Sequence, residues 1–197
     1  MKNIFKNVDL FIKKGERVFL LGPNGCGKTT FLKILMGIYA QTEGKFKIGA
    51  NIKIGYYDQI QESLSMDKTI IDEVWDAYPA LTRTQIRNAL AVFLFCGEDV
   101  FKEINKLSGG ERARVELVKL MLASFNLLIM DEPTNHLDIE SREALEKSLA
   151  DYDGTMIMVS HDRYFINKLA DRIIYLTNDG LESFSGSYDD FCAAQGS

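Results

Sequence analysis

Three short, mostly apolar runs stand out in the chain, at residues 18–21, 126–130 and 155–159. Runs of this length are typical of strands that are buried on both faces of a parallel sheet. Residues 8–12 follow a different pattern, because apolar side chains alternate there with other residues. That alternation predicts a half-buried strand ahead of the first run.

Apolar residues at helical spacing predict three helices. The first has its apolar residues at positions 31, 32, 34 and 35, and Gly37 is its predicted stop. The other two begin at capping boxes, in which a serine or threonine is followed three residues later by a glutamine or glutamate. One box is Thr82–Gln85, with apolar residues continuing to Phe95, and the other is Ser108–Glu111, with a helix to about Ala123.

The end of the chain predicts a β-hairpin, because Asn178-Asp179-Gly180 separates residues 173–176 from residues 181–184. Buried strands that alternate with helices indicate an α/β domain with a mostly parallel sheet. Ligands bind such sheets beyond the carboxyl ends of the strands. The residues best suited to chemistry follow those ends, at Gly22, Asp131 and His161.

The loop after the first apolar run carries the most specific motif. Gly22-Pro23-Asn24-Gly25-Cys26-Gly27-Lys28-Thr29 fits the phosphate-binding pattern G-x-x-x-x-G-K-[ST] between a predicted strand and a predicted helix. The glycines let backbone N–H groups point at phosphate oxygens, and the helix adds its positive end. Lys28 provides a charge for the β- and γ-phosphates, and the Thr29 hydroxyl is a candidate Mg²⁺ ligand. We assign this loop and the following Thr30 to ATP binding, and we interpret the Cys26 thiol as a packing group.

Two carboxylates, Asp131 and Glu132, follow the run at 126–130. Neighbouring residues of a strand point to opposite sides, so one carboxylate can hold a metal while the other faces an attacking water. Asp131 fits the Mg²⁺ ligand and Glu132 fits the general base. An Asp-Glu pair on its own is usually a solvated turn, and the phosphate loop is what favours the functional interpretation.

His161 follows the third buried run and is predicted to reach the same sheet edge as Lys28 and Glu132. A lone histidine is more often structural, but this one can hydrogen-bond the γ-phosphate or orient the water. Gln59 lies in a predicted loop, and its amide can reach the metal or the water. Spacing alone gives Gln59 little support, and an ordinary loop glutamine is the competing interpretation.

A second candidate anion site opens the helix that follows Ser108. Leu107-Ser108-Gly109-Gly110-Glu111 combines the N–H groups of a helix start, two glycines that permit close approach, and a hydroxyl. The competing interpretation is a capped helix with a glycine-rich start. Spacing alone leaves open whether this site and the phosphate loop share one nucleotide.

Composition limits the class of protein. The chain has 197 residues, of which 46% are hydrophobic and 26% charged, as in soluble domains. The three cysteines form no Cys-x-x-Cys pair, which argues against a disulfide framework or zinc site and for a reducing compartment. No apolar run approaches ~18 residues and no secretory signal is visible, so we predict a cytoplasmic protein without membrane insertion. The net charge of −5 neither indicates nor excludes nucleic-acid binding.

In their order, these motifs resemble those of the ATP-binding cassette (ABC) proteins: the phosphate loop, the Gln59 loop, a Leu-Ser-Gly-Gly signature, Asp131-Glu132 and His161. The resemblance implies one P-loop NTPase domain over residues 1–197. Its fold would be an ABC cassette with a mostly parallel core sheet, an antiparallel β lobe and a helical lobe at about 63–124. The family mechanism is ATP hydrolysis with Mg²⁺ by two cassettes paired head to tail. Ser108, Gly109 and Gly110 would then contact the other cassette's ATP in trans, with Asp138 at the seam.

Two further segments resemble the ABC-F branch of the family: Asp-Glu-Pro-Thr-Asn-His-Leu-Asp at 131–138 and Ser-His-Asp-Arg-Tyr-Phe at 160–165. Glu111 also fits the ABC-F branch, because many transporter cassettes carry glutamine at that position. Residues 93–102 resemble the second cassette of ABC-F proteins. ABC-F proteins carry two cassettes and no membrane domain. Most act on the ribosome, and some protect it from antibiotics, so the resemblance implies the ribosome and its RNA as partners.

The chain departs from the ABC-F pattern in two ways. It has one cassette without the helical linker, and it starts too late to include the aromatic residue that stacks on adenine in the family. We therefore expect a C-terminal piece of a longer protein, paired with another cassette of that protein or with a second copy. Base–aromatic stacking contributes ~1–3 kcal/mol in nucleic-acid binders, so ATP affinity of the isolated piece is expected to be lower by about tenfold. Its turnover alone is expected to be low.

Three cellular roles are open at this point. One is an ATPase module on the ribosome. The candidates for contacting RNA phosphates are Arg112, Arg114, Arg142, Arg163 and Lys168. Most of these are expected to be ordinary surface or intradomain ion-pair residues. Another is the cytoplasmic cassette of a membrane transporter, with the helical lobe docked on a transmembrane partner. The third is a DNA-repair or chromosome-structural cassette, which the absence of long coiled-coil or zinc-binding insertions disfavours.

Overall fold

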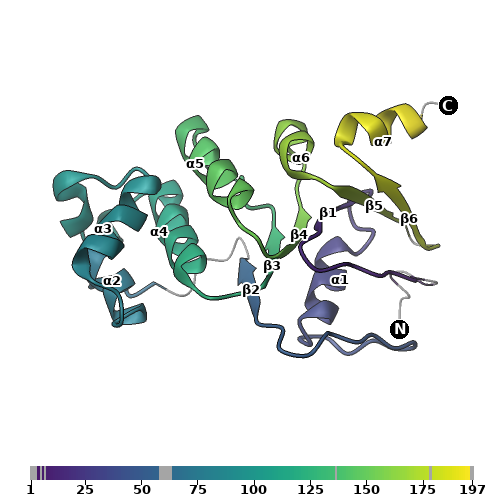
Figure 1. Ribbon diagram of the computed structural model, residues 1–197, viewed down its shortest axis with the longest axis horizontal. Coiled ribbons are helices and arrows are strands. Elements are labelled where there is room, and N and C mark those ends of the chain that lie inside the picture. Colours follow the sequence, from purple (N-terminus) through teal and green to yellow (C-terminus); the bar gives the residue numbers. More distant parts are fainter. Residues whose placement is uncertain are drawn as a thin grey trace. The chain divides into compact units, whose positions relative to one another are not determined.

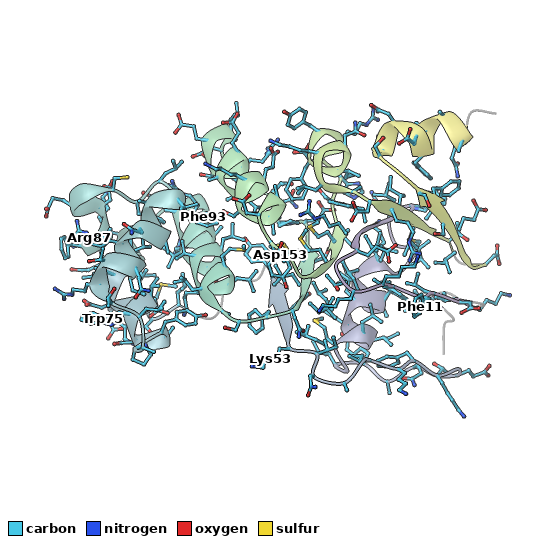
Figure 2. The ribbon with its side chains drawn as sticks, in the orientation of Figure 1. Phe11, Lys53, Trp75, Arg87, Phe93 and Asp153 are labelled. Atoms are coloured by element: carbon cyan, nitrogen blue, oxygen red, sulfur yellow. The ribbon has the colours of Figure 1, made fainter. Side chains whose placement is uncertain are left out.

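The chain forms two compact units in a computed structural model that describes residues 4, 6, 8–57, 64–135, 137–177 and 179–195. The first unit comprises residues 1–57, 125–133 and 153–197, and the second comprises 58–124 and 134–152. Because the second unit is built from two insertions into the first, the chain passes between the units four times. Figure 1 shows the elements of each unit, and Figure 2 adds the side chains in the same orientation.

A six-stranded sheet forms the centre of the first unit, with strand order β2-β3-β4-β1-β5-β6. Neighbouring strands are parallel except for β5 and β6, which pair antiparallel. The strands are β1 (Arg17–Leu21), β2 (Ile54–Tyr57), β3 (Leu127–Asp131), β4 (Thr155–Val159), β5 (Arg172–Leu176) and β6 (Leu181–Ser185). The predicted α/β fold with a mostly parallel sheet is confirmed, as are the three buried runs and the C-terminal hairpin.

Helices cover both faces of this sheet. Val18 and Leu20 of β1 pack in one apolar cluster with Phe31 of α1 (Lys28–Leu35). The side chain between them, Phe19, points to the other face and meets Phe165 of α6 (Arg163–Leu169) edge to face, with ring centroids 5.9 Å apart. Because strand side chains alternate, α1 and α6 must lie on opposite faces, as Figure 1 shows.

Two further features complete the first unit. Helix α1 stops at Gly37 as predicted, with the N–H of Gly37 donating to the Ile34 carbonyl and the N–H of Ile38 to the Lys33 carbonyl, each at 2.9 Å. Helix α7 (Tyr188–Gln195) packs Phe191 against an aromatic cluster of Tyr175, Phe184 and Tyr188. This cluster fixes the hairpin edge of the sheet.

The second unit is helical in its described residues. It contains α2 (Ile70–Ala77), α3 (Arg83–Val92), α4 (Gly109–Leu122), α5 (Ile139–Ala150) and two short 3₁₀ helices at Gly97–Phe101 and Ile104–Lys106. Both predicted capping boxes are present, at the starts of α3 and α4. The apolar core includes Ile70, Ile71, Val74, Ile86, Leu90, Ile104 and Leu117.

One ion pair crosses this core between α2 and α4. The Lys119 ammonium lies 2.6 Å from the Glu73 carboxylate, and only 4% of the Glu73 side chain is exposed. The hydroxyl of Tyr78 donates to the Lys119 carbonyl and adds a second link between the same helices. Removing Lys119 would leave the buried Glu73 carboxylate without an opposite charge, with the Ser65 N–H at 3.4 Å as its remaining donor.

Some sequence expectations differ from the structure. Residues 8–12 belong to no strand, although their burial alternates as predicted and Val8, Leu10 and Ile12 pack against the core. The antiparallel part of the described sheet is therefore the β5–β6 pair. The helix predicted to reach Phe95 ends at Val92, because Leu94 adopts a positive φ of 67° that no α-helix accommodates. Residue 178 of the hairpin turn lies outside the described residues.

Candidate functional site

The loop at 22–29 joins the end of β1 to the first turn of α1. Gly22 has φ +149°, and a β-carbon there would collide with the Leu176 carbonyl oxygen and the Cys26 sulfur. Gly27 has φ +105° as the residue before α1, a left-handed conformation that other residues rarely adopt. The glycines of the motif are thus required by the curl of the backbone itself.

Lys28 lies within that curl. Its ammonium donates to the carbonyl oxygens of Gly22, at 2.8 Å, and of Pro23, at 3.2 Å. The loop therefore folds around a positive charge at the start of a helix, which is a suitable place for a phosphate. Cys26 is 4% exposed and belongs to the apolar cluster beneath the loop, as expected of a packing residue.

Thr29 and Asp131 meet at the same sheet edge, although they are 102 residues apart in sequence. The Thr29 hydroxyl donates to the Asp131 carboxylate at 2.7 Å. Asp131 is the last residue of β3 and is 8% exposed. Two hard oxygen atoms, of the kind that Mg²⁺ prefers, are thus already adjacent at the mouth of the loop.

Glu132 and His161 form a second contact at this edge. The Nε2 atom of His161 lies 3.4 Å from one carboxylate oxygen of Glu132, and the His161 backbone N–H donates to the other oxygen at 3.2 Å. The N–H of Glu132 itself donates to the carbonyl of Val159, the last residue of β4. Glu132 is thereby anchored to the neighbouring strand at the point where it leaves its own.

The backbone of Glu132 explains how the two carboxylates separate. Glu132 has a positive φ of 53°, which is uncommon for a residue with a side chain and costs on the order of 1–3 kcal/mol. Asp131 meets Thr29 while Glu132 turns to His161. Burial raises the pKa of the Glu132 carboxyl, and the charge and backbone N–H of His161 oppose that rise. Nothing in the sequence signalled the left-handed turn.

The first unit thus brings together five of the predicted residues: Lys28, Thr29, Asp131, Glu132 and His161. Pro23, Asn24 and Gly25 form the exposed rim of the loop, and Thr30 lies partly buried in α1. Gln59 lies outside the described residues, so its place at the site stays a prediction.

The signature residues Ser108, Gly109 and Gly110 belong to the second unit, at the start of α4. The Ser108 hydroxyl oxygen accepts the N–H of Glu111, and the Glu111 carboxylate accepts the N–H of Ser108. Asp138 caps α5 in the same unit by accepting the N–H of Ser141 at 2.8 Å. Hydrogen bonds from the Ser141 hydroxyl and from its backbone N–H lower the pKa of Asp138, with a smaller contribution from Arg114.

Several of the basic residues proposed for RNA have partners within their own unit. The guanidinium groups of Arg114 and Arg163 lie over the rings of Phe95 and Tyr188, at 4.8 and 5.5 Å from the centroids. The Lys168 ammonium lies 5.7 Å from the centroid of Tyr164. These contacts favour the interpretation of these three as intradomain residues.

The oxygen atoms of Thr29 and Asp131 match candidate Mg²⁺ ligands in kind and spacing. Adjacent ligands of an octahedral Mg²⁺ at about 2.1 Å are separated by about 3.0 Å, close to the observed Thr29–Asp131 distance of 2.7 Å. Mg²⁺ usually takes one or two protein oxygens and completes its shell with water and phosphate. In the described residues no cluster of three or more His, Cys, Asp or Glu side chains could hold a metal, so Thr29 and Asp131 would act together with a nucleotide.

The family model described as "ABC transporter" matches residues 5–135. The chain therefore belongs to the ABC transporter family, and it is an ATP-binding cassette of the ATPase class. None of the helices in the described part of the chain has the length and apolar character needed to cross a bilayer.

The similar proteins include members of the F branch. YdiF of Bacillus subtilis is 48% identical over 94% of the chain. ABC transporter F family member 5 of Arabidopsis thaliana is 41% identical over 95%, and the ATP-binding protein Uup of Haemophilus influenzae is 41% identical over 96%. The chain spans only 29%, 28% and 30% of these proteins, respectively.

Two solved structures share the fold. One is of an RNase-L inhibitor, with a TM-score of 0.73 and 26% identity, and the match covers 94% of this chain and 38% of that one. The other is a dimeric post-hydrolysis state of the ATP-binding cassette MJ0796 bound to ADP and Pi, with a TM-score of 0.71 and 26% identity. That match covers 92% of this chain and 90% of the other, and the cassette in it is a dimer.

Proposed function

We propose that the chain hydrolyses ATP with Mg²⁺ at the sheet edge formed by β1, β3 and β4. The observation that carries the proposal is the convergence of two contacts there, Thr29 with Asp131 and Glu132 with His161, beside a glycine loop wrapped around Lys28. A purely structural loop has no need of a metal-ligand pair and a carboxylate–histidine pair at the same edge.

Each residue has a distinct role in this proposal. The loop N–H groups and Lys28 hold the β- and γ-phosphates, and Thr29 and Asp131 hold the Mg²⁺ that offsets phosphate charge. Glu132 accepts a proton from the attacking water as the new P–O bond forms and ADP leaves. His161 orients that water or the γ-phosphate through Nε2, and Gln59 stays a candidate for the same task or for the metal.

The closing of the site is proposed to need a second cassette. Ser108, Gly109 and Gly110 of one cassette would contact the γ-phosphate held by the other, with Asp138 at the seam. The dimeric cassette among the similar structures supports this arrangement. The partner would be another cassette of a longer protein, of which this chain is the C-terminal cassette, or a second copy of the chain.

ATP hydrolysis can be tested against protein concentration. Phosphate release by the 197-residue chain should be slow when dilute and should rise more steeply than linearly with protein concentration, because two signatures must meet two nucleotides. Hydrolysis that is robust and strictly proportional to protein concentration would contradict the pairing.

The cellular role proposed here is a cytoplasmic ABC-F module that acts on the ribosome, as a translation factor or as a resistance protein. The F-family relatives and the segments at 131–138 and 160–165 support it. A transporter subunit is the alternative. Full-length protein carrying Glu132→Gln should hold ATP and co-sediment with ribosomes more than wild type does. Equal recovery of the two proteins with ribosomes would favour the transporter role.

A further inference from the structure

The first turn of α4 carries a negative charge at the place where the signature would receive a phosphate. Glu111 accepts the N–H of Ser108 at 2.8 Å, and the Ser108 oxygen accepts the N–H of Glu111 at 3.2 Å. A helix start is equivalent to about half a positive charge. In the unpaired cassette, that charge already faces the carboxylate of Glu111.

The neighbours of Glu111 keep it charged. The hydrogen bond to the Ser108 backbone lowers its pKa, with smaller contributions from Lys102 and Arg114. Both cations have other partners, because Lys102 lies 2.7 Å from Asp99 and Arg114 lies over the Phe95 ring. The carboxylate is therefore ionised near neutral pH and only partly balanced by its surroundings.

We infer that Glu111 limits the strength of ATP-dependent cassette pairing. Its carboxylate stabilises the first turn of α4 in the unpaired cassette and repels the γ-phosphate that Ser108 receives in the paired one. Glu111 is thus a residue that sets affinity, distinct from those that bind or hydrolyse the nucleotide. The inference rests on the pairing in the proposed function.

The other capping box of the same unit provides a neutral counterpart. At the start of α3 the Gln85 amide oxygen accepts the N–H of Thr82 at 2.9 Å, and the Thr82 oxygen accepts the N–H of Gln85 at 3.3 Å. An amide therefore makes the same two hydrogen bonds as a carboxylate. Glu111→Gln should keep the box and remove only the charge, whereas Glu111→Ala removes both.

The test measures self-association of the 197-residue chain by sedimentation equilibrium with MgATP, in the Glu132→Gln background that prevents hydrolysis. Adding Glu111→Gln should lower the dimer dissociation constant by about twofold to fivefold for each of the two signatures in the dimer, the range expected for a charge at a helix terminus. The same change should lower the Tm of the nucleotide-free chain by about 1–3 °C. A residue with a merely structural role would not strengthen the dimer while destabilising the unpaired chain.

Gln85→Glu is the matched control, because it adds a carboxylate to a capping box with no proposed phosphate. It should raise Tm slightly and leave the dimer dissociation constant unchanged. ATP binding by the dilute, unpaired chain should be the same in every variant.

The outcomes separate the two proposals. If the Glu132→Gln chain dimerises in ATP and Glu111→Gln makes the dimer no tighter, the role of Glu111 is overturned while the pairing stands. If every variant binds ATP and none dimerises, the pairing proposal fails, and the role of Glu111 fails with it.

Discussion

The two units place their chemistry in different ways. In the first unit, residues far apart in sequence meet at one sheet edge, as Thr29 and Asp131 do. In the second unit, the signature is local, since Ser108 and Glu111 belong to one turn of one helix. Parallel strands collect distant residues at their carboxyl ends, whereas a helix start presents its own N–H groups. Damage to the first unit should therefore abolish binding and catalysis, and damage to the second should affect stability and pairing.

Replacing Lys28 should produce the largest effect. Lys28→Ala removes the ammonium from the phosphate loop, and we expect ATP affinity to fall by at least about a hundredfold, because a charge-assisted hydrogen bond to each of two phosphates is lost. Titration with a fluorescent ATP analogue measures this. Lys33→Ala is the control, since Lys33 lies in the same helix with its ammonium over the Tyr39 ring. Normal ATP affinity in the Lys28→Ala variant would contradict the assignment of the loop at 22–29 to phosphate binding.

Replacing Glu132 should separate catalysis from binding. Glu132→Gln removes the general base and keeps the shape of the side chain, so the rate of phosphate release should fall by about 10²–10⁴. ATP affinity measured by titration should stay within a few-fold of wild type. A parallel loss of affinity would mean that Glu132 organises the loop as well as the water.

In the second unit, Lys119→Met tests the buried ion pair. It leaves the Glu73 carboxylate buried without its partner, and we expect a loss of about 3 kcal/mol of unfolding free energy, seen as a Tm lower by about 6–12 °C. ATP affinity at a temperature well below unfolding should be unchanged. The double variant Glu73→Gln/Lys119→Met should recover most of the Tm, and a double variant as unstable as the single one would contradict the ion-pair explanation.

The smallest predicted effect is on how the stability of the chain depends on pH. The folded chain raises the pKa of Glu132 through burial, so it binds that proton more tightly than the unfolded chain does. Ionised Glu132 therefore costs stability above its folded pKa, and the cost disappears as pH falls below the ordinary value of 4.5. Glu132→Gln should raise Tm by about 1–3 °C at neutral pH, and this gain should shrink toward pH 4.5 and vanish below it.

Calorimetry over a pH series measures this difference, with Glu182→Gln as a control at an exposed glutamate of β6. A Tm gain of Glu132→Gln that persists unchanged into acid would show that the gain does not come from ionisation. Because the pKa of Glu132 is raised, the hydrolysis rate should begin to fall on acidification at a higher pH than it would with a general base of ordinary glutamate pKa.

Features that depend on local chemistry follow from the amino-acid sequence alone. Both capping boxes, the Gly37 stop and the buried strands could be predicted because neighbouring residues satisfy one another's N–H groups or repeat with a fixed period. The phosphate loop could be predicted for the same reason, since a glycine such as Gly22 is dictated by the backbone curl at its own position.

Which side chains meet, and which way they turn, depends on contacts between distant segments. The positive φ of Glu132 arises where it leaves β3 while anchored to β4, and the residues around it carry no glycine to signal it. The alternation at 8–12 correctly predicted which side chains are partly buried against the core. No strand formed there, because a strand needs a hydrogen-bonding neighbour as well as a pattern. Local sequence sets conformational preference, whereas pairing and packing across distant segments choose among the conformations that remain.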